Sequence, residues 1–135
     1  MDTTIDKVTG RVPVTIFRLS GSLDGSNYDE LINAGIEAEA TGTTDLLLDM
    51  RNLEFMSSAG MVGLQMLLRL MGGETSPRHA GAAAFRPAGP SGGAAGVAHM
   101  KLFGPTPDVD RVLETVGLKD FVQIYDNEID AIASF

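Results

Sequence analysis

The chain has 135 residues, of which 44% are hydrophobic, and its formal net charge at pH 7 is −8. This length and composition fit one folded domain with a substantial core. The negative charge argues against nucleic-acid binding, because the phosphates would be repelled. The absence of cysteine excludes disulfides, thiol catalysis and cysteine-ligated metals.

The sequence has no feature that predicts membrane insertion or export. The first ten residues, MDTTIDKVTG, lack the basic and then apolar pattern of a signal peptide. Its apolar runs fall short of the roughly 18 residues that a spanning helix needs. We therefore expect a cytoplasmic protein without membrane insertion.

The first half of the chain predicts a hairpin and a buried strand. Residues 4–8 and 12–20 are rich in β-branched residues, and Thr9-Gly10 marks a turn between them. The apolar run 45–49 is bracketed by aspartates and is too short for an ordinary helix. It predicts a buried central strand.

Two helices are expected around that strand. The first follows Gly25, with Ser26 as its N-cap and Asp29 in a weakened capping box, and ends at 41–43. The second covers about 59–71 and is apolar nearly all round. Such a helix is either wholly buried or offers a face to a partner.

Residues 72–98 have a different composition, since 18 of these 27 residues are Gly, Ala or Pro. No helical or strand period is present, so we expect a flexible insertion within a single domain spanning 1–135.

The C-terminal part predicts two more strand and helix pairs. Thr106 is expected to cap a helix with Pro107 at its first position, and Gly117 to end it. A final helix is expected with Ile129 and Ile132 facing inward. The two expected strands are 99–103 and 121–125. One expected helix begins at residue 107, and the other covers 127–134.

The resulting order is β-β-α-β-α-β-α-β-α. Strands that alternate with helices after a first hairpin predict an α/β fold with a mainly parallel sheet and right-handed crossovers.

Catalytic chemistry finds little support in the sequence. The nucleophile elbow G-x-S-x-G is absent around Ser57 and Ser58, and the two histidines, His79 and His99, lie on separate elements. Isolated histidines without cysteines give no metal-ligand spacing. We therefore expect neither an enzyme nor a cofactor or metal site.

The paired serines Ser57 and Ser58 stand at the expected start of the 59–71 helix. A serine there is most often an N-cap. The same position also tolerates a phosphate, because free N–H groups and a partial positive charge lie at a helix N-terminus. Residue spacing alone leaves both Ser57 and Ser58 as candidates for either role, N-cap or phosphate acceptor.

Three stretches together resemble the STAS domain family, in its bacterial anti-sigma factor antagonist branch. The resemblance runs from about residue 4 to 135, except for 72–98. The stretches are RLSGSLDGSNYDEL (18–31), LLLDMRNLEFMSSAGMVGL (46–64) and PDVDRVLETVGLKDFVQIYDNEIDAIASF (107–135).

This resemblance implies a STAS-like fold and regulation by partner switching. The unphosphorylated antagonist would bind an anti-sigma factor that is also a serine kinase, which releases the sigma factor; phosphorylation would end the complex, and a serine phosphatase would reset it. The motif places the phosphoacceptor at Ser58, with Ser57 as the alternative. The residues implied near the phosphosite or in partner binding are Asp24, Asp49, Asn52, Met56, Ser57, Gly60 and Met61.

Two other functions stay open at this point. One is a STAS accessory or scaffold subunit of a stress-sensing or lipid-transport complex, which is never phosphorylated. The other is a small-ligand sensor that uses 72–98 as a lid.

Overall fold

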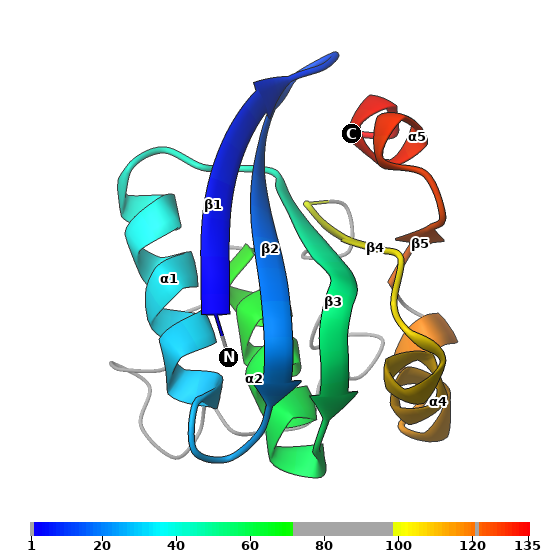
Figure 1. Cartoon of the computed structure of the whole chain (residues 1–135). Coiled ribbons are helices and arrows are strands. Elements are labelled where there is room, and N and C mark those ends of the chain that lie inside the picture. Colours follow the sequence, from blue (N-terminus) through cyan, green and yellow to red (C-terminus); the bar gives the residue numbers. More distant parts are fainter. Residues whose placement is uncertain (1, 72–98, 121) are drawn as a thin grey trace.

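The computed structural model describes residues 2–71, 99–120 and 122–135, which form a five-stranded sheet with helices on both faces (Figure 1). The sheet order is β1-β2-β3-β4-β5; β1 and β2 are antiparallel, and the other neighbours are parallel. The predicted mainly parallel sheet is thus confirmed. The strands are β1 (Asp2–Thr9), β2 (Pro13–Leu23), β3 (Leu46–Met56), β4 (Met100–Phe103) and β5 (Ile124–Tyr125).

The helices follow the predicted order. They are α1 (Tyr28–Ala40), α2 (Ser58–Met71), α4 (Pro107–Thr115) and α5 (Glu128–Ala133), with a short 3₁₀ helix, η3 (Leu118–Asp120). The flexible insertion predicted at 72–98 lies outside the described residues.

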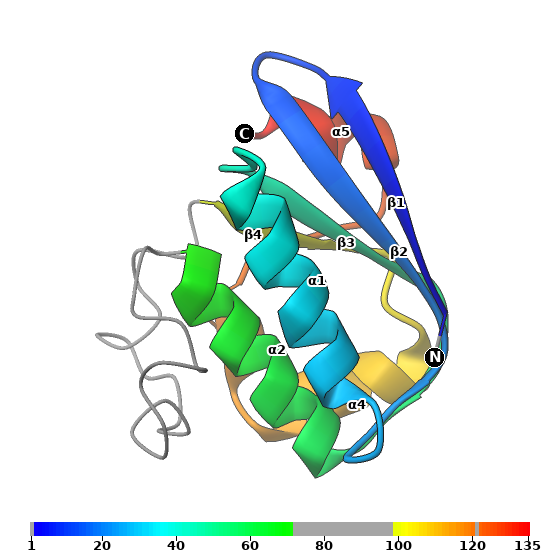
Figure 2. The same ribbon diagram turned by 90° about the vertical axis from the view of Figure 1, so that its left-hand side faces the viewer.

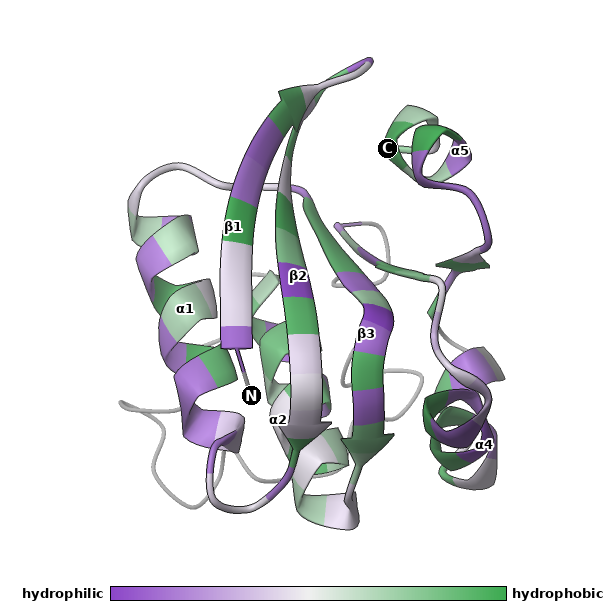
Figure 3. Ribbon diagram, viewed as in Figure 1, coloured by the Kyte–Doolittle hydropathy of each residue, from purple (hydrophilic) through white to green (hydrophobic). Residues whose placement is uncertain are grey.

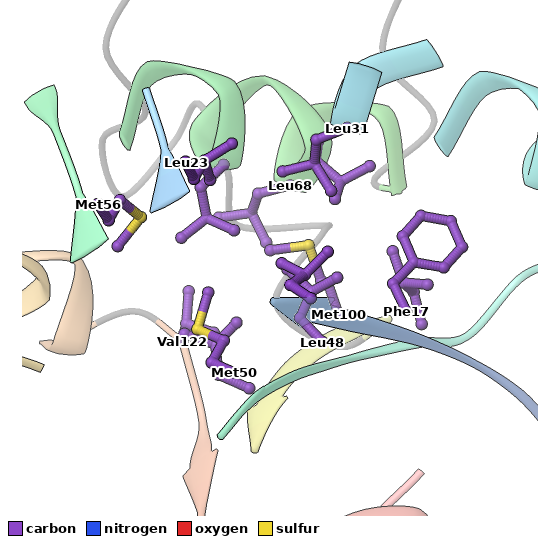
Figure 4. Packing of buried hydrophobic residues seen from close by; sticks show 14 of the residues in the cluster. Phe17, Leu23, Leu31, Leu48, Met50, Met56, Leu68, Met100 and Val122 are labelled. Carbon is purple, nitrogen blue, oxygen red and sulfur yellow. The ribbon is translucent and has the colours of Figure 1, made fainter. Parts of the chain in front are cut away.

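Both faces of the sheet are packed. The inner face, which α1, α2 and α4 cover, holds the main core, where Phe17, Leu48 and Met50 of the strands meet Leu31 and Leu68 of the helices (Figures 2 and 4). The opposite, outer face carries a smaller cluster beneath α5. That cluster contains Val14, Ile16, Leu47, Phe103 and Ala131.

β2 and β3 are longer than predicted, since they continue to Leu23 and Met56 instead of ending near residues 20 and 49. Their parallel pairing continues from Ser20↔Asn52 to Leu23↔Met56, with one extra residue on β3 at each of two register shifts. Backbone pairing therefore extends both strands through polar and glycine residues that carry no strand signal of their own.

Two predicted helix caps are wrong in detail. Asn27, not Ser26, is the N-cap of α1, because the Ser26 hydroxyl donates to the Asp24 carboxylate at 2.6 Å. Thr106 holds the N-cap position of α4, but its hydroxyl donates to the carbonyl of Leu53 at 2.9 Å. Each hydroxyl therefore donates to an acceptor outside its helix, a local one for Ser26 and one on β3 for Thr106.

The C-terminal region differs from the prediction in two places. The last strand is only Ile124–Tyr125, because Leu118–Asp120 form a 3₁₀ turn just before it. Ile129 is 76% exposed, so the expectation that it faces inward is wrong, whereas Ile132 packs in the outer cluster. Gly117, with a φ of +77°, follows α4 as predicted.

Candidate functional site

The paired serines lie where the C-terminal ends of β2 and β3 meet the N-termini of α1 and α2, at the lower end of Figure 1. β2 and β3 pair as far as Leu23 and Met56. The Ser57 N–H then donates to the Leu23 carbonyl at 2.9 Å. The turn that begins α2 is thus fixed to the end of β2.

Ser57 caps α2. Its hydroxyl accepts a hydrogen bond from the Gly60 N–H at 3.1 Å, and its carbonyl accepts the N–H of Met61 at 2.9 Å. This bond from the third helical residue to the preceding hydroxyl is the usual N-cap geometry. The Ser57 hydroxyl is therefore occupied by its own helix.

Ser58 differs from its neighbour. It is the first residue of α2, and its side chain is exposed. Its hydroxyl has no hydrogen-bond partner among residues 2–71, 99–120 and 122–135. Since the first turn of a helix has free N–H groups and a partial positive charge, this hydroxyl stands where an added phosphate is tolerated.

The sequence also implicated Met56, Gly60 and Met61, and all three are buried. Met56 and Met61 belong to the main core. A Cβ on Gly60 would lie 2.4 Å from the Leu23 carbonyl oxygen, so the helix start packs directly on the β2 backbone. These residues shape the site from within and offer little surface to a partner.

Asp24 lies beside the serine turn. It follows β2, and a Cβ on the next residue, Gly25, would lie 3.4 Å from the Ala59 Cβ of α2. The Asp24 carboxylate accepts bonds from the Ser26 hydroxyl at 2.6 Å and the Ser26 N–H at 2.9 Å. These two bonds lower the pKa of Asp24. A negative charge therefore stands near Ser58 at neutral pH.

Asp49 lies away from the serines, contrary to expectation. It precedes Met56 by seven residues on β3, a stretch that pairs with five steps of β2, from Arg18 to Leu23, and is therefore about 17 Å long. Its carboxylate is 2% exposed and accepts bonds from Arg18 at 2.8 Å and from Arg51 at 2.9 and 3.0 Å. Burial raises the pKa of Asp49, but the bonds from Arg51 and Arg18 outweigh it and leave that pKa below its ordinary value.

Arg18 is the centre of this charged network on the outer face. Besides Asp49, it binds Asp6 of β1 at 2.6 Å and Glu128 of α5 at 2.6 Å. The hydrogen bonds that Arg18 donates to these carboxylates, first to Glu128 and then to Asp6, raise the pKa of Arg18. Hydrophilic segments in the middle of β2 and β3 are visible in Figure 3. Asp49 is thus a structural residue of the sheet.

Two exposed residues of this end were not singled out from the sequence. Glu54 and Phe55 are both exposed near the end of β3, and Phe55 is 50% exposed. Asn52, which was expected at the site, is also exposed and pairs with Ser20 on β2. Phe55 is a large apolar residue between Leu53 and Met56, and both of those residues are buried. Its sequence context therefore does not indicate that it is exposed.

Residues 2–71, 99–120 and 122–135 contain neither a metal-ligand cluster nor a membrane-spanning helix. There, no group of three or more His, Cys, Asp or Glu side chains is arranged to hold a metal ion. None of the helices in the described part of the chain has the length and hydrophobicity to cross a membrane.

The family of the chain follows from comparison with known sequences. The sequence model of the STAS domain matches residues 5–72, so the chain belongs to the STAS domain family. A curated relative, the anti-sigma F factor antagonist of Paenibacillus polymyxa, is 29% identical over 123 residues, which cover 88% of this chain and 84% of the relative.

Solved structures agree with this fold. A putative anti-sigma factor antagonist from Thermotoga maritima has a TM-score of 0.67 at 19% identity, covering 95% of this chain and 91% of its own. The Bacillus cell fate determinant SpoIIAA in its phosphorylated form has a TM-score of 0.61 at 20% identity, covering 97% and 96%. At this identity the two structures bear on the fold alone.

Proposed function

We propose that this protein is an anti-sigma factor antagonist controlled by phosphorylation of Ser58. In its unphosphorylated form it binds an anti-sigma factor that is also a serine kinase and thereby releases the sigma factor. The kinase phosphorylates Ser58 and ends the complex, and a serine phosphatase restores it. In this proposal the protein acts in the cytoplasm as a regulator and a kinase substrate, not as an enzyme.

The observation that carries the proposal is the different environment of the two serines. Ser57 is engaged in capping α2, whereas the Ser58 hydroxyl is exposed on the first turn of the same helix. A kinase needs an accessible hydroxyl, and the first turn of a helix stabilises the phosphate that results. The relation to the Paenibacillus antagonist supports the partner class.

Phosphorylation of Ser58 would change the surface that a partner contacts. A phosphate adds nearly two negative charges at neutral pH. It would stand close to the ionised Asp24 and near the exposed Glu54. The surface that a partner contacts would change in charge while the backbone, fixed by the bond from Ser57 to Leu23, stays in place.

The test uses the purified anti-sigma kinase of the same organism with ATP. Wild type and Ser57→Ala should each gain one phosphate by intact-protein mass spectrometry, and Ser58→Ala should gain none. Ser58→Asp should bind the kinase at least tenfold more weakly by calorimetry, with an unchanged circular dichroism spectrum.

Three results would count against the proposal. Full phosphorylation of Ser58→Ala would move the acceptor to another residue. Unchanged affinity of Ser58→Asp would remove the switch and favour a STAS subunit that is never phosphorylated. Absence of any complex with wild type would reject the function itself.

A further inference from the structure

We propose that Phe55 is the apolar anchor of the surface by which this protein contacts its partner, and that the partner presents a basic surface with an apolar recess for this ring. The inference rests on the proposed function, because it concerns the surface around Ser58. It assigns a role to a residue that belongs neither to the serine turn nor to the core.

The orientation of Phe55 follows from its neighbours on β3. Met56 is buried in the main core and pairs with Leu23, which is buried on the same inner face. Because successive strand residues point to opposite faces, Phe55 and its partner Ser22 lie on the outer face. Phe55 therefore stands on the outer face, three residues before Ser58.

The described part of the chain leaves half of Phe55 uncovered. The outer cluster beneath α5 is formed by the first residues of β2 and β3, such as Val14 and Leu47, at the far end of the sheet from the start of α2 (Figure 1). Phe55 is outside that cluster and stays 50% exposed. A single exposed apolar residue is ordinary. The significance of this one is that it lies three residues before the exposed Ser58.

The charge around Phe55 indicates the chemistry of the partner. Residues 19–68 contain eight acidic residues and one basic residue, Arg51, which binds Asp49. Four of these acids lie on this end and are exposed or half-exposed, namely Asp24, Asp29, Glu30 and Glu54. An aromatic residue with charged residues around it is the usual composition of an interface centre and its rim. Charge complementarity then requires a basic partner surface.

In this arrangement, phosphorylation of Ser58 would act on the close contact between the two proteins. A phosphate on Ser58 would add like charge to an already acidic rim, next to the ring that fills the partner's recess. The basic partner would still be attracted at long range, so the loss must come from the geometry of close contact. We therefore expect phosphorylation to act mainly on the dissociation rate, whereas rim charges act on the association rate.

The experiment measures binding of the unphosphorylated protein to the purified anti-sigma kinase by biolayer interferometry. Phe55→Ala should weaken the complex at least tenfold, through faster dissociation, and Phe55→Leu should recover part of the loss. Glu54→Lys should slow association at low salt and reduce its salt dependence.

Matched controls lie at the other end of the molecule. Ile129→Ala removes a more exposed apolar side chain from α5, and Glu37→Lys reverses an exposed charge near the end of α1. Both should leave binding within twofold of wild type. The melting temperature of every variant should also be measured. Replacing an exposed or half-exposed side chain should cost little stability, so each variant should melt close to wild type.

The outcomes separate this inference from the proposed function. Loss of affinity in Phe55→Ala with both controls unchanged supports it. Binding of Phe55→Ala within twofold of wild type overturns it, while a weakened Ser58→Asp in the same experiment leaves the antagonist function intact. If wild type forms no complex with the kinase, both proposals fail together.

Discussion

Ser57 and Ser58 are chemically identical residues with different environments. One hydroxyl accepts the Gly60 N–H, and the other is exposed one residue further along. Because an N-cap residue lies just before the helix and the next residue lies within it, a single step along the chain changes the direction of the side chain. The cap and the proposed phosphoacceptor are therefore separate residues.

We expect Ser57→Ala to lower the free energy of unfolding by about 1 kcal/mol, because the cap bond to Gly60 is lost. Urea denaturation followed by circular dichroism measures this. Ser57→Gly should cost only a few tenths of that amount. Equal stability of Ser57→Ala and wild type would show that this hydroxyl does not cap α2 in solution.

At the scale of elements, the site depends on how closely α2 approaches β2. The helix begins at the end of β2, where Gly60 packs on the Leu23 backbone. The β2–β3 pairing that continues to Leu23 and Met56 fixes the place from which α2 starts. The extended β2–β3 pairing and the close packing of Gly60 on the β2 backbone together place Ser58 at the surface.

Gly60→Ala should therefore destabilise the protein by about 1–3 kcal/mol, as overpacking does, despite the better helix propensity of alanine. The added Cβ would meet the Leu23 carbonyl, and a backbone atom cannot rotate away. Gly25→Ala is the control, since its Cβ would make only ordinary contact with Ala59. Denaturation midpoints that are equal for both variants would contradict this packing.

At the scale of the whole molecule, one arginine links four elements on the outer face. Arg18 of β2 binds Asp6 of β1, Asp49 of β3 and Glu128 of α5. Lys101 of β4 adds a second link to the end of the chain, with a bond to the Ser134 carbonyl at 2.8 Å. These contacts hold the small outer layer to the sheet.

Asp49→Asn should lower the free energy of unfolding at pH 7 by about 3 kcal/mol, the low end for breaking a buried ion pair. The pKa of Asp49 is lowered in the folded protein. Its stabilising contribution is therefore complete above the unfolded value of about 3.9 and is lost as the pH falls through the folded value.

Urea titrations between pH 7 and pH 2 check this dependence. The difference between wild type and Asp49→Asn should be constant above about pH 5 and should shrink below about pH 4. A difference that stayed constant to pH 2 would show that Asp49 does not titrate with a lowered pKa.

The order of elements was predictable because each carries its own local signal. Apolar runs, Pro107 at a helix start and Gly117 at its end were read correctly. The ends of β2 and β3 were not, because pairing between strands, not local propensity, extends them. Ile129 was misjudged because helical period shows that a face is apolar but not which neighbour covers it.

The sequence by itself determined the family, the αβ alternation and the presence of a serine pair before an apolar helix. Only the tertiary structure decided which serine is the cap, that Asp49 belongs to an arginine network and that Phe55 is exposed near the end of β3. The physical reason is that burial and the Arg18 partner of Asp49 come from segments far apart in the chain, and that the role of each serine depends on the residue at which α2 begins.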